Sequence, residues 1–583
     1  MVEYRKNTRR NSFVKVIIGL ALIFSLNTIG SFFFQRFDLT SEKRYSLSDA
    51  TKSMLAELND VVYFKVYLDG DFPAGFRRLQ NETREMLDEF RAYSDNIQYE
   101  FINPSSSSDA KVRDGIYRQL LESGLNPTDL QVRKEGGLSR QLIFPGALVS
   151  YRGNELPLEL LKTQLGASPE QQLNNSVQSL EFNLASVIRK LTVSSKPRIA
   201  YIRGHGELDG INVADFLDAL SEFYTVEQVT INGQLSSLFL HTPGKDSSEV
   251  IISNKYRAII VAKPDSAFPE KDKFIIDQFI MKGGKSLWLV DPVYAEMDSL
   301  QNQNQTVGIT NEVNLSDLFF NYGARLNNSL VMDLNALPIP VVTGKMGNQP
   351  KTDFLPWYFF PVVTPSSPHP IVRNLNALKF EFAGSIDTLD TPGVRKTILL
   401  KSSRYSRLLD APAHISLDML HREPEATEFS QPHQPMAVLL EGTFVSLFLN
   451  RVPPEISGAP EIGFKDKSNH TAMIVVADGD IGKSQVRSGS SGPEYLPAGY
   501  DRFTGQQFGN RDFLLNAVNF LCDDSELLTV RSREIKLRLL DATRIREEEL
   551  RWQLVNTVVP VLLVMLFGVI YLFIRKHRYG RVR

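Results

Sequence analysis

The sequence predicts an α/β protein with a large body between two membrane-spanning helices. Apolar runs long enough to cross a bilayer, residues 16–34 and 555–574, lie near the two ends of the chain. Between them, apolar segments rich in β-branched residues alternate with segments of helical periodicity, a pattern typical of α/β folds. The chain has 583 residues, which is too long for one hydrophobic core, so we expect two to four domains.

The overall composition excludes several classes of protein. The 65 basic and 67 acidic residues give a formal net charge of −2, and no long basic stripe lies outside the termini. This balance argues against nucleic acid as a partner. Cys522 is the single cysteine, so the chain can form neither an internal disulfide nor a cysteine-rich zinc site.

The N-terminal apolar run, residues 16–34, follows Lys15 and four further basic residues in the tail 1–15. Basic residues before an apolar run also fit a cleavable signal peptide. The run has no Ala-x-Ala cleavage site, and three phenylalanines (residues 32–34) extend it. We therefore expect an uncleaved signal anchor, transmembrane helix 1.

The C-terminal run, residues 555–574, has no charged residue in twenty positions and would be about 30 Å long as a helix. A buried core helix is the alternative, but such helices are seldom apolar on every face for five turns. Pro560 removes one backbone donor and predicts a kink, which would matter for packing against another membrane protein or be a tolerated irregularity. The run is flanked by side chains that favour the two membrane interfaces, Trp552 on one side and Arg575, Lys576, His577 and Arg578 on the other.

The basic flanks of both runs predict the topology. By the positive-inside rule, the tails 1–15 and 575–583 lie in the cytoplasm. The body then lies on the far side, which is the periplasm if the chain resides in a bacterial inner membrane. A charged, mostly helical stalk, residues 531–554, leads into transmembrane helix 2.

Residues 35–193 predict a first α/β domain. Ser48 is an expected N-cap for a helix at 49–58, and a strand, a helix and a strand are expected at 61–70, 76–93 and 97–104. Two further strands (141–144, 147–151) and a helix (171–191) complete the domain. This order resembles a thioredoxin-like fold, but its redox chemistry requires Cys-x-x-Cys and the region has no cysteine. We expect a scaffold or a binding module.

Residues 194–530 predict a second α/β domain with a β-rich extension. Four apolar strands are expected at 198–204, 225–231, 256–264 and 286–292, with helices at 213–223, 269–281 and 510–521. Strands buried on both faces are typical of a parallel sheet covered by helices. The proline-rich segment 337–370 is expected to be irregular. The domain resembles a doubly wound, glutamine-amidotransferase-like fold.

Ligands of doubly wound sheets bind beyond the carboxyl ends of the strands, here the loops 204–209, 263–265 and 291–294. A turn in which His205 merely packs or caps is the favoured alternative to a functional loop, since one histidine with one carboxylate is weak evidence. The candidate ligand or partner residues in these loops are Gly204, His205, Gly206, Glu207 and Asp291.

Other chemistries have weaker support. Amidotransferase activity would require a nucleophilic cysteine, and Cys522 follows a helix and precedes two aspartates that would raise its pKa. The aromatic run 357–360 fits a sugar-stacking platform or, more commonly, core packing. We expect no metal, because three histidines that lie near one another in the sequence lack zinc-ligand spacing: His414, His421 and His433. We also expect no cofactor.

Several separated segments carry a family resemblance: RFDLTSEKRYSLS (36–48), KPRIAYIRGHGE (196–207), and LLDATRIREEELRWQLVNTVVP (539–560) before the last apolar run. They resemble the gliding-motility-associated ABC-transporter auxiliary, or substrate-binding, proteins of the GldG type. That resemblance implies a multi-pass permease, a cytoplasmic ATPase, other periplasmic motility or secretion proteins, and a bacterium of the Bacteroidetes.

The chain itself lacks the G-x-x-x-x-G-K-[ST] loop, so ATP hydrolysis would come from a partner. We therefore expect a non-enzymatic membrane-anchored subunit whose body binds a ligand or a partner. The alternatives are a membrane-anchored hydrolase or amidotransferase that uses residues 204–207, and a glycan-binding module that uses residues 357–360.

Overall fold

The fold was determined as a computed structural model. It describes residues 14–15, 17–25, 28, 46–134, 137–165, 167–193, 196–243, 250–301, 303–346, 349–422, 424–489, 492–522 and 542–579. Two compact units are present: residues 1–38 with 45–533, and residues 39–44 with 534–583. Each is described by itself.

The first part of the larger unit is built on a four-stranded sheet with the order β2-β1-β5-β6. β1 pairs with β2 in parallel and with β5 in antiparallel fashion, which confirms the predicted strand–helix–strand unit. The N-cap prediction is also confirmed, because the Ser48 side chain accepts a hydrogen bond from the Thr51 backbone N–H. The elements are α2 (Asp49–Ala56), β1 (Val62–Val66), α3 (Ala74–Tyr93), β2 (Ile97–Phe101), α4 (Ala110–Glu122), β3 (Thr128–Lys134), β4 (Gly137–Ile143), β5 (Gly146–Tyr151) and β6 (Asn154–Glu159).

The expected single helix at 171–191 is two helices, α5 (Pro169–Gln178) and α6 (Leu180–Thr192). Ser168 and Gln171 form a capping box at the start of α5, with a proline at its first turn. α6 carries the buried face, with Leu180, Leu184 and Ile188 in the core against the sheet. Helical periodicity continues through Ser179, which is why the sequence pattern did not reveal the break.

The second part of the larger unit contains a seven-stranded sheet with the order β20-β23-β24-β12-β11-β7-β8. The five strands from β24 to β8 are parallel, while β23 runs antiparallel between β24 and β20. The predicted parallel sheet is confirmed. Its elements are β7 (Arg198–Arg203), α7 (Ala214–Ser221), β8 (Thr225–Thr230), β11 (Ala258–Ala262), α8 (Glu270–Met281), β12 (Lys285–Leu289), α10 (Ser316–Tyr322), β20 (Val394–Lys401), β23 (Pro435–Gly442), β24 (Thr471–Val476) and α12 (Asn510–Cys522).

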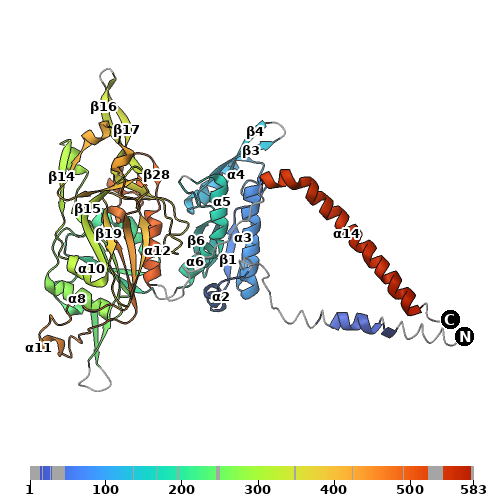
Figure 1. Ribbon diagram of the computed structural model, residues 1–583, viewed down its shortest axis with the longest axis horizontal. Helices are drawn as coiled ribbons and strands as arrows, with labels where there is room; N and C mark the ends of the chain where they lie inside the picture. The colour runs from blue at the N-terminus through green and yellow to red at the C-terminus, as the bar shows by residue number, and fades with distance from the viewer. Residues whose placement is uncertain are drawn as a thin grey trace. The chain divides into compact units, whose positions relative to one another are not determined.

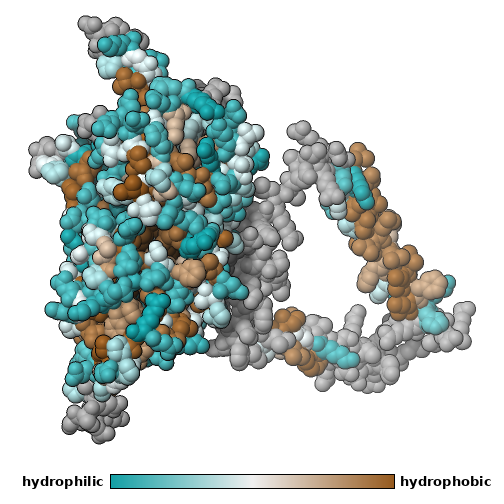
Figure 2. Space-filling view, turned by 60° about the vertical axis from the view of Figure 1, so that its left-hand side comes forward, coloured by the Kyte–Doolittle hydropathy of each residue, from teal (hydrophilic) through white to brown (hydrophobic). Residues whose placement is uncertain are grey.

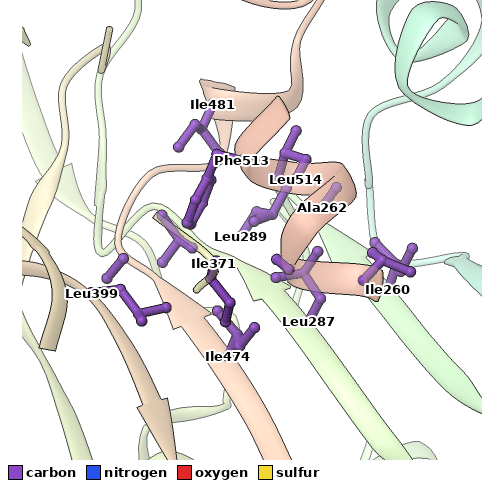
Figure 3. Close-up of a cluster of buried hydrophobic side chains, with 14 of the residues drawn as sticks. Ile260, Ala262, Leu287, Leu289, Ile371, Leu399, Ile474, Ile481, Phe513 and Leu514 are labelled. Carbon is purple, nitrogen blue, oxygen red and sulfur yellow. The ribbon is translucent and has the colours of Figure 1, made fainter. Parts of the chain in front are cut away.

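Helices cover both faces of this sheet. On one face, α7 and α12 pack against alternate strand residues; Figure 3 shows Phe513 and Leu514 of α12 beside Leu287 and Leu289 of β12. On the other face, α8 and α10 cover Trp288 and its neighbours. All five residues of β11 are buried, as two-sided cover requires. The loops beyond the strand ends are thereby held on a rigid scaffold.

The β-rich extension is formed by small sheets, and one prediction there was wrong. Residues 337–370 are not irregular: β16 and β17 pair as a long antiparallel hairpin (Figure 1). β16 is an edge strand, where prolines are tolerated because an outward N–H is not needed, and Pro338 and Pro340 lie in it. The extension and the shorter elements are β9 (Phe239–Pro243), β10 (Val250–Asn254), β13 (Val293–Tyr294), α9 (Asp298–Gln301), β14 (Gln305–Thr310), β15 (Ala324–Asp333), β16 (Ala336–Met346), β17 (Gln349–Val363), β18 (Leu378–Lys379), β19 (Gly384–Thr388), β21 (Ser406–Asp410), β22 (Ala413–Ser416), α11 (Pro454–Ser457), β25 (Val486–Gly489), β26 (Gly492–Tyr495), β27 (Tyr500–Asp501) and β28 (Gln506–Gln507).

In the described residues of the smaller unit, 542–579, the chain forms the continuous helix α14 (Ala542–Tyr579), with Pro560 inside it. Within it, residues Glu548–His577 are long and apolar enough to cross a membrane, and none of their most apolar window is buried. Figure 2 shows this helix as a largely hydrophobic surface. The predicted stalk is described from residue 542 onward only; residues 531–541 lie outside the described residues.

The first predicted span, residues 16–34, is not supported as a second membrane helix. Its described residues, 17–25 and 28, are helical together with Val14 and Lys15. The remainder of the run lies outside the described residues. Among the residues that the structure describes, one helix is long and apolar enough to span a membrane, and it is the C-terminal one.

Candidate functional site

Charged side chains converge where the parallel strands end. Lys263 comes directly after β11, Asp291 lies two residues beyond β12, and Asp478 lies two residues beyond β24. β11, β12 and β24 are adjacent and parallel, so their carboxyl ends meet at one edge of the sheet. This is the edge at which ligands of doubly wound sheets bind.

Lys263 is the centre of a charge network with a buried core (Lys263, Asp291, Asp480) and two partly exposed members (Glu296, Lys483), which we call the Lys263 network. The Lys263 Nζ lies 2.8 and 2.7 Å from the two carboxylate oxygens of Asp480. It is 3.4 Å from Glu296 and 3.9 Å from Asp291. Lys483 adds a second contact to Asp480, at 3.1 Å. Two lysines thus compensate a carboxylate that burial alone would destabilise.

Backbone groups fix the aspartates of this edge. The Gly479 N–H donates to Asp291. Asp478 accepts from the N–H of Asp480 at 2.7 Å and from the N–H of Glu381 at 2.8 Å. A Cβ on Gly479 would lie 2.6 Å from the Lys263 side chain, so only glycine fits between the two aspartates. The Asp-Gly-Asp sequence at 478–480 is therefore set by close packing.

The surroundings shift the pKa values of these carboxyl groups in opposite directions. Burial, reinforced by the charge of Asp480, raises the pKa of Asp291 to about 7. Burial and the neighbouring carboxylates also raise the pKa of Asp478. Asp480 behaves oppositely: burial would raise its pKa, but the charges of Lys263 and Lys483 outweigh burial and lower it. Asp480 is the carboxylate that keeps its charge.

The same three aspartates lie close enough together to be considered as a metal site. Oxygen atoms of Asp291, Asp478 and Asp480 are within 4.8 Å of one another, a spacing that would suit one cation. Against this, the ammonium of Lys263 already bonds both oxygens of Asp480. The donor set fits an internally neutralised charge network better than a metal centre.

A cavity of about 570 Å³ adjoins the Lys263 network. Its polar side includes Glu296, Asp480, Lys483 and Ser484, and its apolar side includes residues of the β16–β17 hairpin and nearby Phe382. A volume of this size and a mixed lining are typical of small-molecule sites. The cavity therefore lies where the strand topology places a ligand.

His205, the sharpest candidate from the sequence, lies in a separate buried network that we call the His205 network: His205, Glu207, Phe268 and Asp272. Its Nδ1 is 3.0 Å from Glu207 and its Nε2 is 3.0 Å from Asp272. The ring stacks on Phe268, with centroids 3.7 Å apart. Burial would lower the pKa of His205, but its bonds to both carboxylates outweigh burial and raise it. The residue is only 3 % exposed.

The two glycines around His205 serve the backbone. Gly204 and Gly206 have φ of +113° and +77°, which disfavour other residues. The His205 carbonyl accepts hydrogen bonds from the N–H groups of Asp265 and Ser266, both at 3.0 Å. These contacts fit the structural alternative for residues 204–207, since both ring nitrogens are already bonded. Asp291, the remaining candidate, lies in the Lys263 network instead.

The other predicted sites lie in the core, at a helix end or in α14. Trp357 is fully buried and Tyr358, Phe359 and Phe360 are nearly so, which agrees with the core-packing alternative. Among the described residues, the group that could hold a metal ion is Asp291, Asp478 and Asp480. It does not include His414, His421 or His433. Cys522 is buried at the end of α12. The membrane-interface candidates Trp552, Pro560, Arg575, Lys576 and Arg578 lie in α14, where the Trp552 indole donates to Glu548 at 2.8 Å, and Lys15 is helical.

Sequence reasoning missed Asp480, Lys483 and Ser484. The signal was present, because an apolar strand (residues 472–477) runs directly into Asp478-Gly479-Asp480. Its place beside β12 was not predictable, since about 180 residues separate the two adjacent strands. The same rule that selected Asp291 would have selected this segment.

Comparison with known families places the chain. A family described as "ABC-type uncharacterized transport system", an auxiliary component, matches residues 196–517, more than half of the chain. The chain belongs to this family. A second model, described as a domain of unknown function, matches residues 41–150. Membership supports a transporter-associated role, and an ABC transport system implies permease and ATPase partners in general.

Individual relatives add little about chemistry. A protein of Borreliella burgdorferi with the name "Uncharacterized protein" is 20% identical over 587 residues, covering 98% of this chain and 99% of its own length. Among solved structures, the N-terminal domain of mmIFT52 matches with a TM-score of 0.30 and 10% identity, covering 56% of this chain and 97% of that one.

Proposed function

We propose that the chain is a non-enzymatic, membrane-anchored auxiliary subunit of an ABC-type transport complex. The family match over residues 196–517 carries this proposal. The apolar helix at Glu548–His577 supports membrane anchoring through α14. In this complex the permease would form the transport path across the membrane, and the ATPase would supply the energy of ATP hydrolysis. The body of this chain would bind a ligand or transmit conformational changes to partner proteins.

The proposed orientation places the basic C-terminal tail in the cytoplasm and the body in the periplasm. Arg575, Lys576 and Arg578 come after the apolar part of α14, and positive charge is retained on the cytoplasmic side. An N-terminal anchor at residues 16–34, with Lys15 at its interface, is part of the same proposal. Service in gliding motility or secretion, and an origin in the Bacteroidetes, rest on the sequence resemblance.

The two domain folds proposed from the sequence have support from topology. The order β2-β1-β5-β6, with β5 antiparallel to the other three strands, is the arrangement expected of a thioredoxin-like domain without its cysteines. The parallel sheet covered on both faces supports a doubly wound, amidotransferase-like domain.

The absence of catalysis is proposed from the chemistry of the candidate groups. Both ring nitrogens of His205 bond carboxylates, so the imidazole has no lone pair directed at a substrate. The alternative, a hydrolase that uses residues 204–207, predicts loss of function in both His205→Gln and Glu207→Gln variants that still fold. Function retained in either folded variant contradicts that alternative.

Co-purification tests the main proposal. The full chain is isolated from native membranes in mild detergent, and accompanying proteins are identified by mass spectrometry. We expect a multi-pass permease and an ATPase in stoichiometric amounts. A tagged unrelated protein with one membrane helix, prepared identically, is the control; repeated recovery of neither subunit above that control would refute the proposal.

A chimera tests what α14 does. Residues 555–574 are replaced by an unrelated apolar sequence of the same length, keeping Trp552 and the basic flank. We expect the chimera to reach the membrane but to lose the permease, because helix packing in lipid depends on side-chain fit. A second variant, Pro560→Leu, separates a specific kink from general packing. Full recovery of the permease with the chimera would show that the helix is only a tether.

A further inference from the structure

The cavity beside the Lys263 network is lined by both apolar and polar side chains. The apolar ones come mainly from the β16–β17 hairpin and the segment before β19 and include Leu337, Ile339, Phe360 and Phe382. The polar ones come mainly from the carboxyl edge of the parallel sheet and the segment after β24. A ligand that contacts both kinds of side chain has an apolar part and a polar part.

The carboxylates that line the cavity already have ionic or hydrogen-bonding partners. Asp480 bonds two lysines, Glu381 bonds Lys379 at 2.9 Å, and Asp501 accepts from Thr504. A strongly cationic ligand would therefore find few free partners. Glu296 differs, because its side chain is 35% exposed and its contact to Lys263 is long, at 3.4 Å. It offers an acceptor to one positive group.

Arg502 supplies the opposite charge. Its guanidinium lies over the Phe503 ring, 4.7 Å from the centroid, and it lines the cavity. Within the described part of the chain, no carboxylate forms an ion pair with it at 4.0 Å or less. The backbone N–H of Arg502 donates to the side-chain oxygen of Gln485, the residue next to Ser484. This hydrogen bond links the segments that carry Arg502 and Ser484. Arg502 is positioned to receive a carboxylate.

Ser484 carries the second, independent sign of a ligand. The residue is 1% exposed and lines the cavity, yet its Oγ has no hydrogen-bond partner. Its backbone is fixed, since its N–H donates to the Asn212 carbonyl at 2.7 Å. A buried hydroxyl left unpaired is costly and therefore uncommon. A ligand atom in the cavity would satisfy it.

We propose that this cavity binds a zwitterionic ligand with an apolar side chain, namely a free amino acid or a short peptide. Its carboxylate bonds Arg502 and Ser484, its ammonium bonds Glu296, and its side chain packs on Phe360 and Phe382. The inference specifies which class of ligand the body binds. It rests on the proposed function only in so far as the body is a ligand-binding module. Binding is measured on the isolated chain, so its failure is distinct from failure to recover a permease.

Calorimetric titration tests the proposal on the full-length chain in detergent micelles, with empty micelles as the blank. The probes are L-leucine, the dipeptide Leu-Leu, the same dipeptide acetylated and amidated at its ends, maltotriose and spermidine. We expect saturable binding of leucine or Leu-Leu, and at least about a tenfold loss with the blocked dipeptide, which lacks both charges.

Two variants assign the contacts. Arg502→Gln should weaken binding about tenfold or more, and Ser484→Ala about fivefold. Ser484→Ala should leave the melting temperature of the ligand-free protein unchanged or raised, because it removes an unpaired hydroxyl. Arg404→Gln is the matched control: this arginine lies over Tyr405, 4.5 Å from the ring centroid, and does not line the cavity.

The result that overturns the proposal is equally defined. Saturable binding of maltotriose or spermidine without leucine or Leu-Leu would assign the cavity to another ligand class. Binding that is unchanged in both Arg502→Gln and Ser484→Ala would place the peptide elsewhere. No saturable binding of either amino-acid probe would reject the inference, whatever proteins co-purify.

Discussion

The His205 network and the Lys263 network lie at the same edge of one sheet, yet they differ in what surrounds them. His205 is enclosed by two carboxylates and the Phe268 ring, and its ring nitrogens are bonded. The Lys263 network borders an open cavity through Asp480, Lys483 and Glu296. A conspicuous sequence motif thus lies in the closed network, while the open one has an inconspicuous Asp-Gly-Asp.

The difference arises from the segment into which each strand leads. β7 leads into a glycine-rich turn that folds back onto Asp265 and α8, which closes the space around His205. β24 leads into a short helical turn, Asp480–Gly482, that leaves room before β25. Charged and titratable residues therefore have a structural role in the loop after β7, whereas in the loop after β24 they line a cavity.

The largest expected effect is on the Lys263 network. Lys263→Met should lower the free energy of unfolding by about 3–5 kcal/mol, because it leaves the buried Asp480 with only Lys483 and removes the charge beside Asp291. Chemical denaturation of the full chain in detergent measures it. Lys483→Met is the control, since this side chain is 39% exposed and should cost about 1 kcal/mol or less. Equal losses would contradict the central place of Lys263.

Gly206→Ala should have the next largest effect, about 2–3 kcal/mol, on the His205 network. An added Cβ would lie 1.6 Å from the Asp265 carboxylate oxygen, in backbone with φ of +77°. Gly283→Ala separates strain from the clash, because Gly283 has a similar φ of +87° but open space around it, and about 1 kcal/mol is expected. Thermal melting compares them; equal shifts would show that the clash relaxes.

The smallest effect is a pH dependence that distinguishes the closed network. The folded-state pKa of His205 is raised, so its contribution to stability is full below its unfolded pKa of about 6.5 and is lost as pH rises through the folded value. His205→Gln should therefore cost about 1–2 kcal/mol at pH 6 and less at pH 9, as measured by chemical denaturation at both pH values. The groups that face the ring are Glu207, Asp272 and Phe268. If the loss of stability caused by His205→Gln is the same at pH 9 as at pH 6, His205 is not a charged imidazolium in the folded protein.

Local pattern predicted most elements of this protein. The Ser48 cap, the strand–helix–strand unit and the buried parallel strands were readable because each depends on neighbouring residues. The β16–β17 hairpin was not, because a high proline content indicates irregular chain, and only the tertiary pairing shows that Pro338 and Pro340 lie in an edge strand. The α5–α6 break was hidden by helical periodicity that continues across Ser179.

By itself, the sequence determined the α/β class, the apolar C-terminal helix, and the carboxyl-edge loops with His205 and Asp291, because periodicity and strand ends are local properties. Tertiary structure alone decided that His205 is enclosed, that Lys263 bonds Asp480 across 217 positions of sequence, and that Ser484 faces a cavity without a partner. The physical reason is that burial and pairing depend on which strands become neighbours. β24 pairs with β12, although the β-rich extension separates the two strands in the sequence.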